Sequence, residues 1–158
     1  MYQTRQEKVL SALHEIGCDG LVLNAGPSLA YFSGLHFHLM ERPVVFLLVT
    51  GETPIIVLPA LEEQKLDAAD FDFEAISYPD NPAGWQKSFD SACRKIGLQE
   101  KKIGFEPRQL RLLEYGFLET ASPTTSFINA DEAIAQCRAL KDQDEVSRMQ
   151  KAVNIAQD

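Results

Sequence analysis

The sequence predicts an α/β layer fold, in which helices cover a mostly parallel sheet that contains one antiparallel strand. Three observations lead to this prediction. Helical and strand-like patterns alternate along the chain, which is typical of a sheet between helical layers. The apolar run 21–23 shows no alternation, as in a strand buried on both faces. Residues 43–50 and 55–58 are separated by only four residues, and so short a connection forces antiparallel pairing.

The first third of the chain contains a helix, a strand and a short helical turn. Thr4 and Glu7 form the pattern of a capping box, and Gly17 is a natural helix stop. The apolar stripe between them consists of Val9, Leu10, Leu13 and Ile16. The strand 21–23 follows, and then residues 28–33 are expected to form a helical turn that ends at glycine.

The next segment begins with an irregular stretch. Residues 35–42 contain two of the three histidines and no clear period, so we expect a loop. The segments 43–50 and 55–58 then form the antiparallel hairpin described above. Residues 59–69 are rich in helix formers, and residues 73–78 alternate as a strand does.

The second half continues the alternation. The clearest helical stripe in the sequence ends at Gly97 and consists of Trp85, Phe89, Ala92, Cys93 and Ile96. A short strand is expected at 103–105 and a last strand at 124–128. Between these strands Pro107 is expected to open a helix with three residues inward, namely Leu110, Leu113 and Phe117.

The last thirty residues predict two more helices. Asn129 and Glu132 are suited to cap a short helix, and the acidic run 142–145 is suited to start another. The second helix has an apolar stripe at heptad-like spacing, made of Val146, Met149, Val153 and Ala156. The sequence stops within this stripe at Asp158, with no helix-ending signal. Two interpretations remain open: a C-terminal helix on the domain's own core, or the start of a second domain.

Composition limits the class of protein. The 158 residues are 45% hydrophobic and 24% charged, which is usual for one globular domain able to bury its own core. The formal net charge of −8 provides no field that attracts phosphate backbones or anionic lipid, so we expect neither a nucleic-acid nor a membrane partner. The N-terminus has no apolar signal core, and three widely spaced cysteines suggest reduced core residues, so the expected location is cytoplasmic.

Searches for catalytic motifs find little. The turn at 24–28 follows a strand, but its lone glycine does not supply the close backbone approach of a nucleotide-binding loop, and a tight strand-to-helix turn is the simpler interpretation. No GxSxG nucleophile elbow occurs. His36, His38 and Glu41 lie near one another, but on an extended segment the glutamate points away from the two histidines, which is poor geometry for a metal.

The loop 35–42 is nevertheless the most informative segment. Its histidines either present imidazoles for recognition or are solvated side chains without a role. Arg42 either pairs with a carboxylate such as Glu41 or offers a fork to a carboxylate ligand. His14, in contrast, is expected on the outer face of the first helix.

The order of these signals resembles a known family, the N-terminal domain of creatinases and prolidases. The matching segments are the strand 21–23, Leu29-Ala30-Tyr31-Phe32-Ser33-Gly34, residues 41–49 and residues 55–59. The stretch 138–146, followed by Met149 and Ala152, resembles the passage from that domain into the family's catalytic domain. Together these segments cover nearly the whole chain.

The resemblance implies a three-layer α/β/α fold of ribonuclease H-like motif, with five or six strands and one of them antiparallel. It divides the chain into an N-terminal domain, 1–138, and a linker with the first helix of a C-terminal catalytic "pita-bread" domain, 139–158. The family's two divalent metal ions, Mn, Co or Zn, are held by two Asp, one His and two Glu of that catalytic domain. Nothing in residues 1–158 matches these ligands, so this chain is expected to hold no catalytic residue, metal or cofactor.

The implied parent is an Xaa-Pro dipeptidase or aminopeptidase, although creatinase-type members of the family hydrolyse another bond without metal. The N-terminal domain would contribute homodimer contacts and access of a proline-containing peptide to the active site. The resemblance places four residues of the loop and its base at that access: His36, Phe37, His38 and Arg42. The alternative is a free-standing α/β module that binds a small ligand or dimerises without a peptidase domain.

Overall fold

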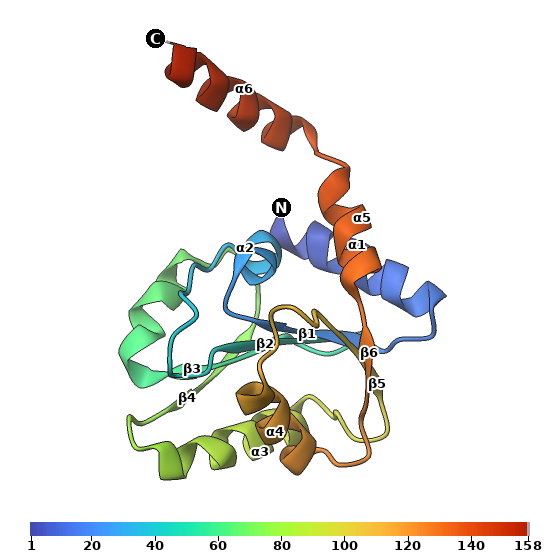
Figure 1. The fold of residues 1–158 in the computed structure, drawn as a ribbon, viewed down its shortest axis with the longest axis vertical. Coiled ribbons are helices and arrows are strands. Elements are labelled where there is room, and N and C mark those ends of the chain that lie inside the picture. Colours follow the sequence, from blue (N-terminus) through green and yellow to red (C-terminus); the bar gives the residue numbers. More distant parts are fainter. Residues whose placement is uncertain (158) are drawn as a thin grey trace.

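A six-stranded sheet lies between two layers of helices in the computed structural model, which describes residues 1–157 (Figure 1). Asp158, the last residue of the expected segment 139–158, lies outside the described residues. The sheet order is β4-β3-β2-β1-β5-β6. Its strands are β1 (Gly20–Asn24), β2 (Val45–Val49), β3 (Ile55–Pro59), β4 (Glu74–Tyr78), β5 (Lys102–Phe105) and β6 (Ser126–Asn129).

The strand directions confirm the predicted mixed sheet. β2 runs antiparallel to both of its neighbours, β1 and β3. The pairs β3–β4, β1–β5 and β5–β6 are parallel, so β2 is the one antiparallel strand among the described residues. The chain therefore starts in the middle of the sheet, builds one half outward to β4, and then crosses back to add β5 and β6.

Alternate side chains of the strands build two apolar cores, one on each face of the sheet. Leu21 and Leu23 of β1 pack in the first core, whereas Val22 packs in the second. The first face is covered by α1 (Tyr2–Glu15), α2 (Pro27–Ser33), α5 (Asp131–Ala139) and the 3₁₀ helix η1 (Ala60–Ala68). The second face is covered by α3 (Trp85–Lys95) and α4 (Leu112–Ala121), with the short 3₁₀ turn η2 (Pro82–Gly84) leading into α3.

The first helix begins earlier than its capping pattern predicts. α1 starts at Tyr2 with no side-chain cap, so the expected capping box of Thr4 and Glu7 is wrong. Tertiary contacts explain the early start. Gly34, the left-handed C-cap of α2, has the Tyr2 ring against it, and a Cβ at Gly34 would lie 2.5 Å from that ring. This close approach fixes the first turn of α1 against the end of α2.

The helix predicted from Pro107 is also shifted. Residues 107–110 form a separate turn, in which the amides of Gln109 and Leu110 donate to the Glu106 carbonyl, and extended backbone at Arg111 separates that turn from α4. Because α4 begins at Leu112, the inward positions change. Leu113 is 40% exposed, so its predicted inward position is wrong, and the two buried residues of α4 are Glu114 and Leu118.

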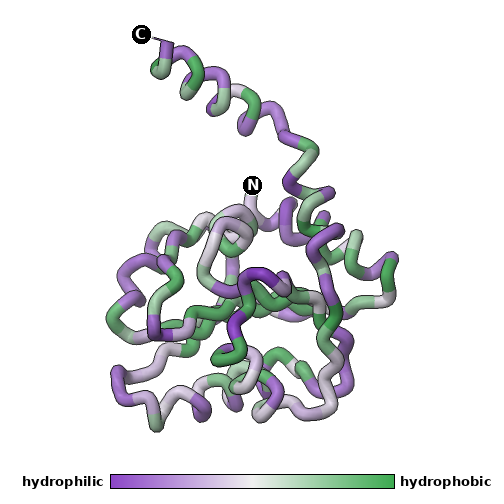
Figure 2. The backbone as a smooth tube through the Cα atoms, viewed as in Figure 1, coloured by the Kyte–Doolittle hydropathy of each residue, from purple (hydrophilic) through white to green (hydrophobic). Residues whose placement is uncertain are grey.

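The last helix, α6 (Gln143–Gln157), extends away from the layers (Figure 1). It begins in the acidic run as predicted, and two residues of that run form a capping box: the Glu145 amide donates to Asp142 Oδ1, and the Asp142 amide donates to Glu145 Oε2. No residue of 143–157 is buried. Hydrophobic and hydrophilic residues alternate along this helix in Figure 2, and four of its apolar side chains are largely exposed: Val146, Met149, Val153 and Ile155.

Candidate functional site

One edge of the sheet gathers the irregular segments of the molecule. β1 and β5 are parallel, so the turn after Asn24 and the turn 106–111 lie at the same edge. β2 is antiparallel to β1 and begins at this edge, with Val45 opposite Asn24. The loop 35–42 therefore ends beside both turns. Carboxyl ends of strands, where the chain order reverses, are the usual ligand-binding edge of an open α/β sheet.

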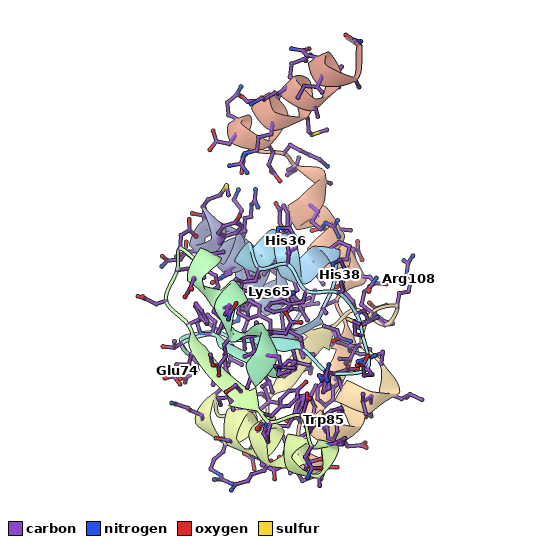
Figure 3. All side chains as sticks on the ribbon, turned by 90° about the vertical axis from the view of Figure 1, so that its left-hand side faces the viewer. His36, His38, Lys65, Glu74, Trp85 and Arg108 are labelled. Carbon is purple, nitrogen blue, oxygen red and sulfur yellow. The ribbon has the colours of Figure 1, made fainter. Side chains whose placement is uncertain are left out.

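The first half of the loop 35–42, residues 35–38, alternates between buried and exposed side chains. His36 and His38 are exposed, whereas Phe37 between them is only 8% exposed and belongs to the first core. The ammonium group of Lys65, on η1, lies 5.3 Å from the centre of the Phe37 ring. Figure 3 labels His36, His38 and Lys65 around this part of the molecule. Phe37 thus anchors the loop, and the two histidines face solvent on either side of the anchor.

A groove of about 400 Å³ lies beside this loop. Its lining comes from the loop, from the turn between β1 and α2, and from the turn 106–111. The lining residues are Ala25, Gly26, Pro27, Ala30, His36, Phe37, His38, Leu39 and Gln109. The structure therefore brings three of the four predicted site residues, His36, Phe37 and His38, to one groove.

Arg42 does not line this groove. Its Nε lies 2.7 Å from Asp80 Oδ1, and its Nη1 lies 3.4 Å from Glu41 Oε1. Of the two roles left open for this arginine, the structure matches the ion pair with neighbouring carboxylates. A partly exposed pair of this kind contributes little to stability, and it lies where the loop joins β2.

The turn after β1 is covered by Gln109 from the neighbouring turn 106–111. Asn24 Oδ1 accepts from the Ala25 amide at 3.0 Å, and Asn24 Nδ2 donates to the Gln109 carbonyl at 3.1 Å. A Cβ on Gly26 would lie 3.3 Å from Gln109 Oε1, so the Gln109 side chain occupies the approach to that glycine. This arrangement matches a tight strand-to-helix turn and leaves no open phosphate cradle at 24–28.

A polar contact at the same edge was missed by sequence reasoning. Ser28 is buried, and its hydroxyl donates to Glu106 Oε1 at 2.7 Å while accepting from Arg138 Nη1 at 3.1 Å. Burial raises the pKa of Glu106, although the Ser28 hydroxyl and the nearby Arg138 lower it in part. Glu106 directly follows β5, and Ser28 lies in the first turn of α2, which follows β1. The parallel pairing of β1 and β5 was the signal that could have predicted this contact. The contact ties the start of α2 to the end of β5.

Sequence reasoning also missed Arg111 and Glu114. Glu114 is completely buried on α4, and it accepts hydrogen bonds from the Arg111 guanidinium. Arg111 Nη1 donates to the Met40 carbonyl of the loop 35–42 at 2.6 Å. The apolar stripe assigned to α4 concealed the inward carboxylate, since Leu113 was placed inward instead.

Neither a metal centre nor a membrane span is found in residues 1–157. No three or more His, Cys, Asp and Glu side chains of the described part converge on a position for a metal ion, and this includes His36, His38 and Glu41. The described helices are all too short or too polar to cross a bilayer. Cys18 and Cys93 are free and buried, and Cys137 is free and half-buried.

Comparison with known proteins identifies the domain type. The sequence-family model of the creatinase/prolidase N-terminal domain matches residues 5–140. A putative dipeptidase, YkvY, from Bacillus subtilis (strain 168) is 24% identical over 152 residues, which span 96% of this chain and 42% of that protein. The chain thus spans about two fifths of the length of this curated relative.

Solved structures show the same fold. A dipeptidase from Pyrococcus horikoshii OT3 matches with a TM-score of 0.80 and 25% identity, over 96% of this chain and 41% of that chain. The creatinase/prolidase N-terminal domain of an X-Pro dipeptidase from Streptococcus pyogenes matches with a TM-score of 0.68 and 19% identity. That match covers 80% of this chain and 98% of the solved chain, so a domain of this fold has been solved without a catalytic domain.

Proposed function

Because the chain belongs to the creatinase/prolidase N-terminal domain family, we propose that it serves a metal-dependent Xaa-Pro dipeptidase or aminopeptidase as a non-catalytic domain. In the proposed homodimer it controls how a proline-containing peptide reaches the active site. The chemistry belongs to a C-terminal catalytic domain, which supplies the two divalent metal ions and the water that they activate. The names of the relatives, a putative dipeptidase and an X-Pro dipeptidase, support this class of substrate.

One observation supports the access role more than any other. The groove at the carboxyl edge of the sheet is flanked by two exposed imidazoles, those of His36 and His38, on a loop held by buried Phe37. Neutral imidazole offers one donor and one acceptor, which suits recognition of the carbonyl and amide groups of a peptide. In this proposal His36 and His38 contact the peptide, Phe37 holds them in place, and Arg42 fixes the base of the loop.

The position of α6 fits a proposed second domain. The family model ends at residue 140, and α6 begins at Gln143 with an apolar stripe that residues 1–157 do not cover. We assign residues 139–158 to the linker and first helix of the catalytic domain, and we expect the stripe to pack there. A downstream reading frame that encodes paired Asp, His and Glu ligands would distinguish this arrangement from a free-standing module.

The access role is tested in the full-length enzyme. We expect His36→Ala combined with His38→Ala to lower kcat/KM for Xaa-Pro dipeptides by about thirtyfold, because two hydrogen bonds of about 1 kcal/mol each are lost. Both side chains are exposed, so the fold should be unaffected. Steady-state kinetics on a panel of Xaa-Pro dipeptides measures kcat/KM and the selectivity among them.

His14→Ala is the matched control, because His14 is an exposed histidine on α1 that does not line this groove. It should leave kcat/KM unchanged. If the double variant also keeps its kcat/KM and its selectivity, the loop takes no part in substrate access and the proposal is wrong.

A further inference from the structure

The buried carboxylate of Glu114 is the starting point. The side chain of Glu114 is 0% exposed, on the face of α4 that packs against the second core. A buried carboxylate strongly destabilises a fold unless it is paired and hydrogen-bonded. Arg111 supplies that pairing, since its Nε lies 3.0 Å from both carboxylate oxygens and its Nη2 also contacts Oε1. These hydrogen bonds raise the pKa of Arg111, which therefore stays charged.

The pairing determines where the rest of the guanidinium points. With Nε and Nη2 held by Glu114, the planar group directs Nη1 to the Met40 carbonyl, 71 residues away in sequence. Within residues 1–157, this is the one hydrogen bond that reaches the backbone of residues 36–41. The Met40 side chain itself is 56% exposed and provides no apolar anchor.

The other contacts of the loop act at its two ends. Leu35 and Phe37 are buried near the beginning, and the buried Tyr78 hydroxyl donates to the Pro43 carbonyl just after the loop. Arg42 reaches Asp80, but both side chains are largely or partly solvent-exposed. The stretch 38–41, which contains His38, therefore depends on Arg111 for its position.

We propose that Arg111 and Glu114 form a latch on α4 that holds residues 38–41 in place and so positions His38 for the peptide. This inference rests on the proposed access role of the loop. It makes Arg111 a positioning residue, which acts through the loop backbone and does not itself touch the peptide. A lysine at position 111 lacks the planar fork and cannot hold Glu114 and Met40 together.

The test must remove the latch without leaving a buried charge. Arg111→Ala alone would strand Glu114 and risks unfolding the domain. The double variant Arg111→Met with Glu114→Leu removes both charges and fills their space with apolar side chains, a change that is often neutral or stabilising. Glu119→Gln is the matched control, because it weakens the exposed hydrogen bond between Tyr115 and Glu119 on the same helix.

The first measurement is limited proteolysis of the 158-residue chain by chymotrypsin, with thermal unfolding as a check of the fold. Cleavage after Leu39 or Met40 should accelerate at least about tenfold in the double variant, because a charged donor to a loop carbonyl disfavours local opening by that factor. Glu119→Gln should cleave at the wild-type rate. A double variant that unfolds at the wild-type temperature and is cleaved within twofold of the wild-type rate would overturn the latch.

The second measurement separates the latch from the proposed function. In the full-length enzyme the double variant should raise KM for Xaa-Pro dipeptides more than it lowers kcat, and Arg111→Lys should behave like the double variant. If the loop loosens while KM stays unchanged, the latch stands and the access role of the loop fails. If the loop does not loosen, the latch is wrong whatever the kinetics show.

Discussion

The loop 35–42 and α6 both lie outside the layers of the fold, yet they are attached to it in different ways. The loop has no regular structure, but it buries Phe37 in the first core and receives a hydrogen bond from Arg111. α6 is a regular helix of 15 residues, and none of them is buried. Regular backbone structure and firm attachment are therefore separate properties in this molecule.

A single arginine attaches the start of α6. Arg5 donates to the Tyr31 carbonyl at 3.1 Å, and its guanidinium lies 4.2 Å from the centre of the Tyr31 ring. The same group pairs with Glu145 at 3.2 Å and Asp142 at 3.5 Å, the two residues of the α6 capping box. Arg5 thus does for α6 what Arg111 does for the loop, but α6 has no counterpart of Phe37.

The largest effect should come from removing the apolar anchor of the loop. Phe37→Ala leaves a cavity in the first core and should lower the free energy of unfolding by about 3 kcal/mol. Urea unfolding followed by fluorescence measures this change. The neighbouring His36→Ala should stay within about 0.5 kcal/mol of the wild type, since His36 is exposed. Equal effects of the two substitutions would mean that the loop is not anchored through Phe37.

An intermediate effect is expected at Arg5. Arg5→Ala removes hydrogen bonds from a charged donor that is 11% exposed, so we expect a loss of about 1.5 kcal/mol in stability. Proteolysis between α5 and α6 should accelerate at the same time, because the first turn of α6 is released. Arg148→Ala removes an exposed arginine from α6 itself and should leave both quantities unchanged. A rigid α5–α6 junction in Arg5→Ala would show that other contacts orient the helix.

The smallest effect is a fraying of α6 in acid. The hydrogen bond from the Glu145 amide, with Arg5 nearby, lowers the pKa of Asp142 below its usual value. Its stabilising contribution is therefore present above the unfolded pKa of about 3.9 and is lost as the pH falls through the lower folded value. NMR Cα shifts of residues 142–148 should move toward coil values below about pH 4.

Asp142→Asn is the control for this titration, because asparagine caps a helix equally well but does not ionise in this range. Its α6 shifts should depend less on pH than those of the wild type. Wild-type shifts that stay helical at pH 2.5 would contradict the assigned role of the capping box.

The layers of the fold could be predicted because local patterns and tertiary structure agree in them. The apolar run 21–23 and the stripe from Trp85 to Ile96 are buried in the structure as their periods indicate. α4 shows why other features could not be predicted. Leu113 and Glu114 are neighbours, yet the leucine is exposed and the carboxylate faces inward, where it accepts hydrogen bonds from the Arg111 guanidinium.

In the candidate site, too, local features could be predicted better than contacts between distant residues. His36 and His38 are exposed on either side of buried Phe37, and the sequence predicts an irregular loop here without a period that would assign these positions. The contacts of Arg42 with Asp80 and of Ser28 with Glu106 join residues far apart in the chain. Such pairs depend on strand order, and strand order is only weakly encoded in any local window.

The order of the strands also has a consequence for synthesis of the protein. Strands β1 to β4 are consecutive in the sheet, and all of them lie within the first 78 residues. Four of the six described strands can therefore pair while the ribosome is still adding the second half of the chain. The emerging sheet keeps β1 as an open edge until β5 arrives, and β5 then covers an edge that is already formed. The strand placed first in the sequence is thus the template on which the later half of the domain is completed.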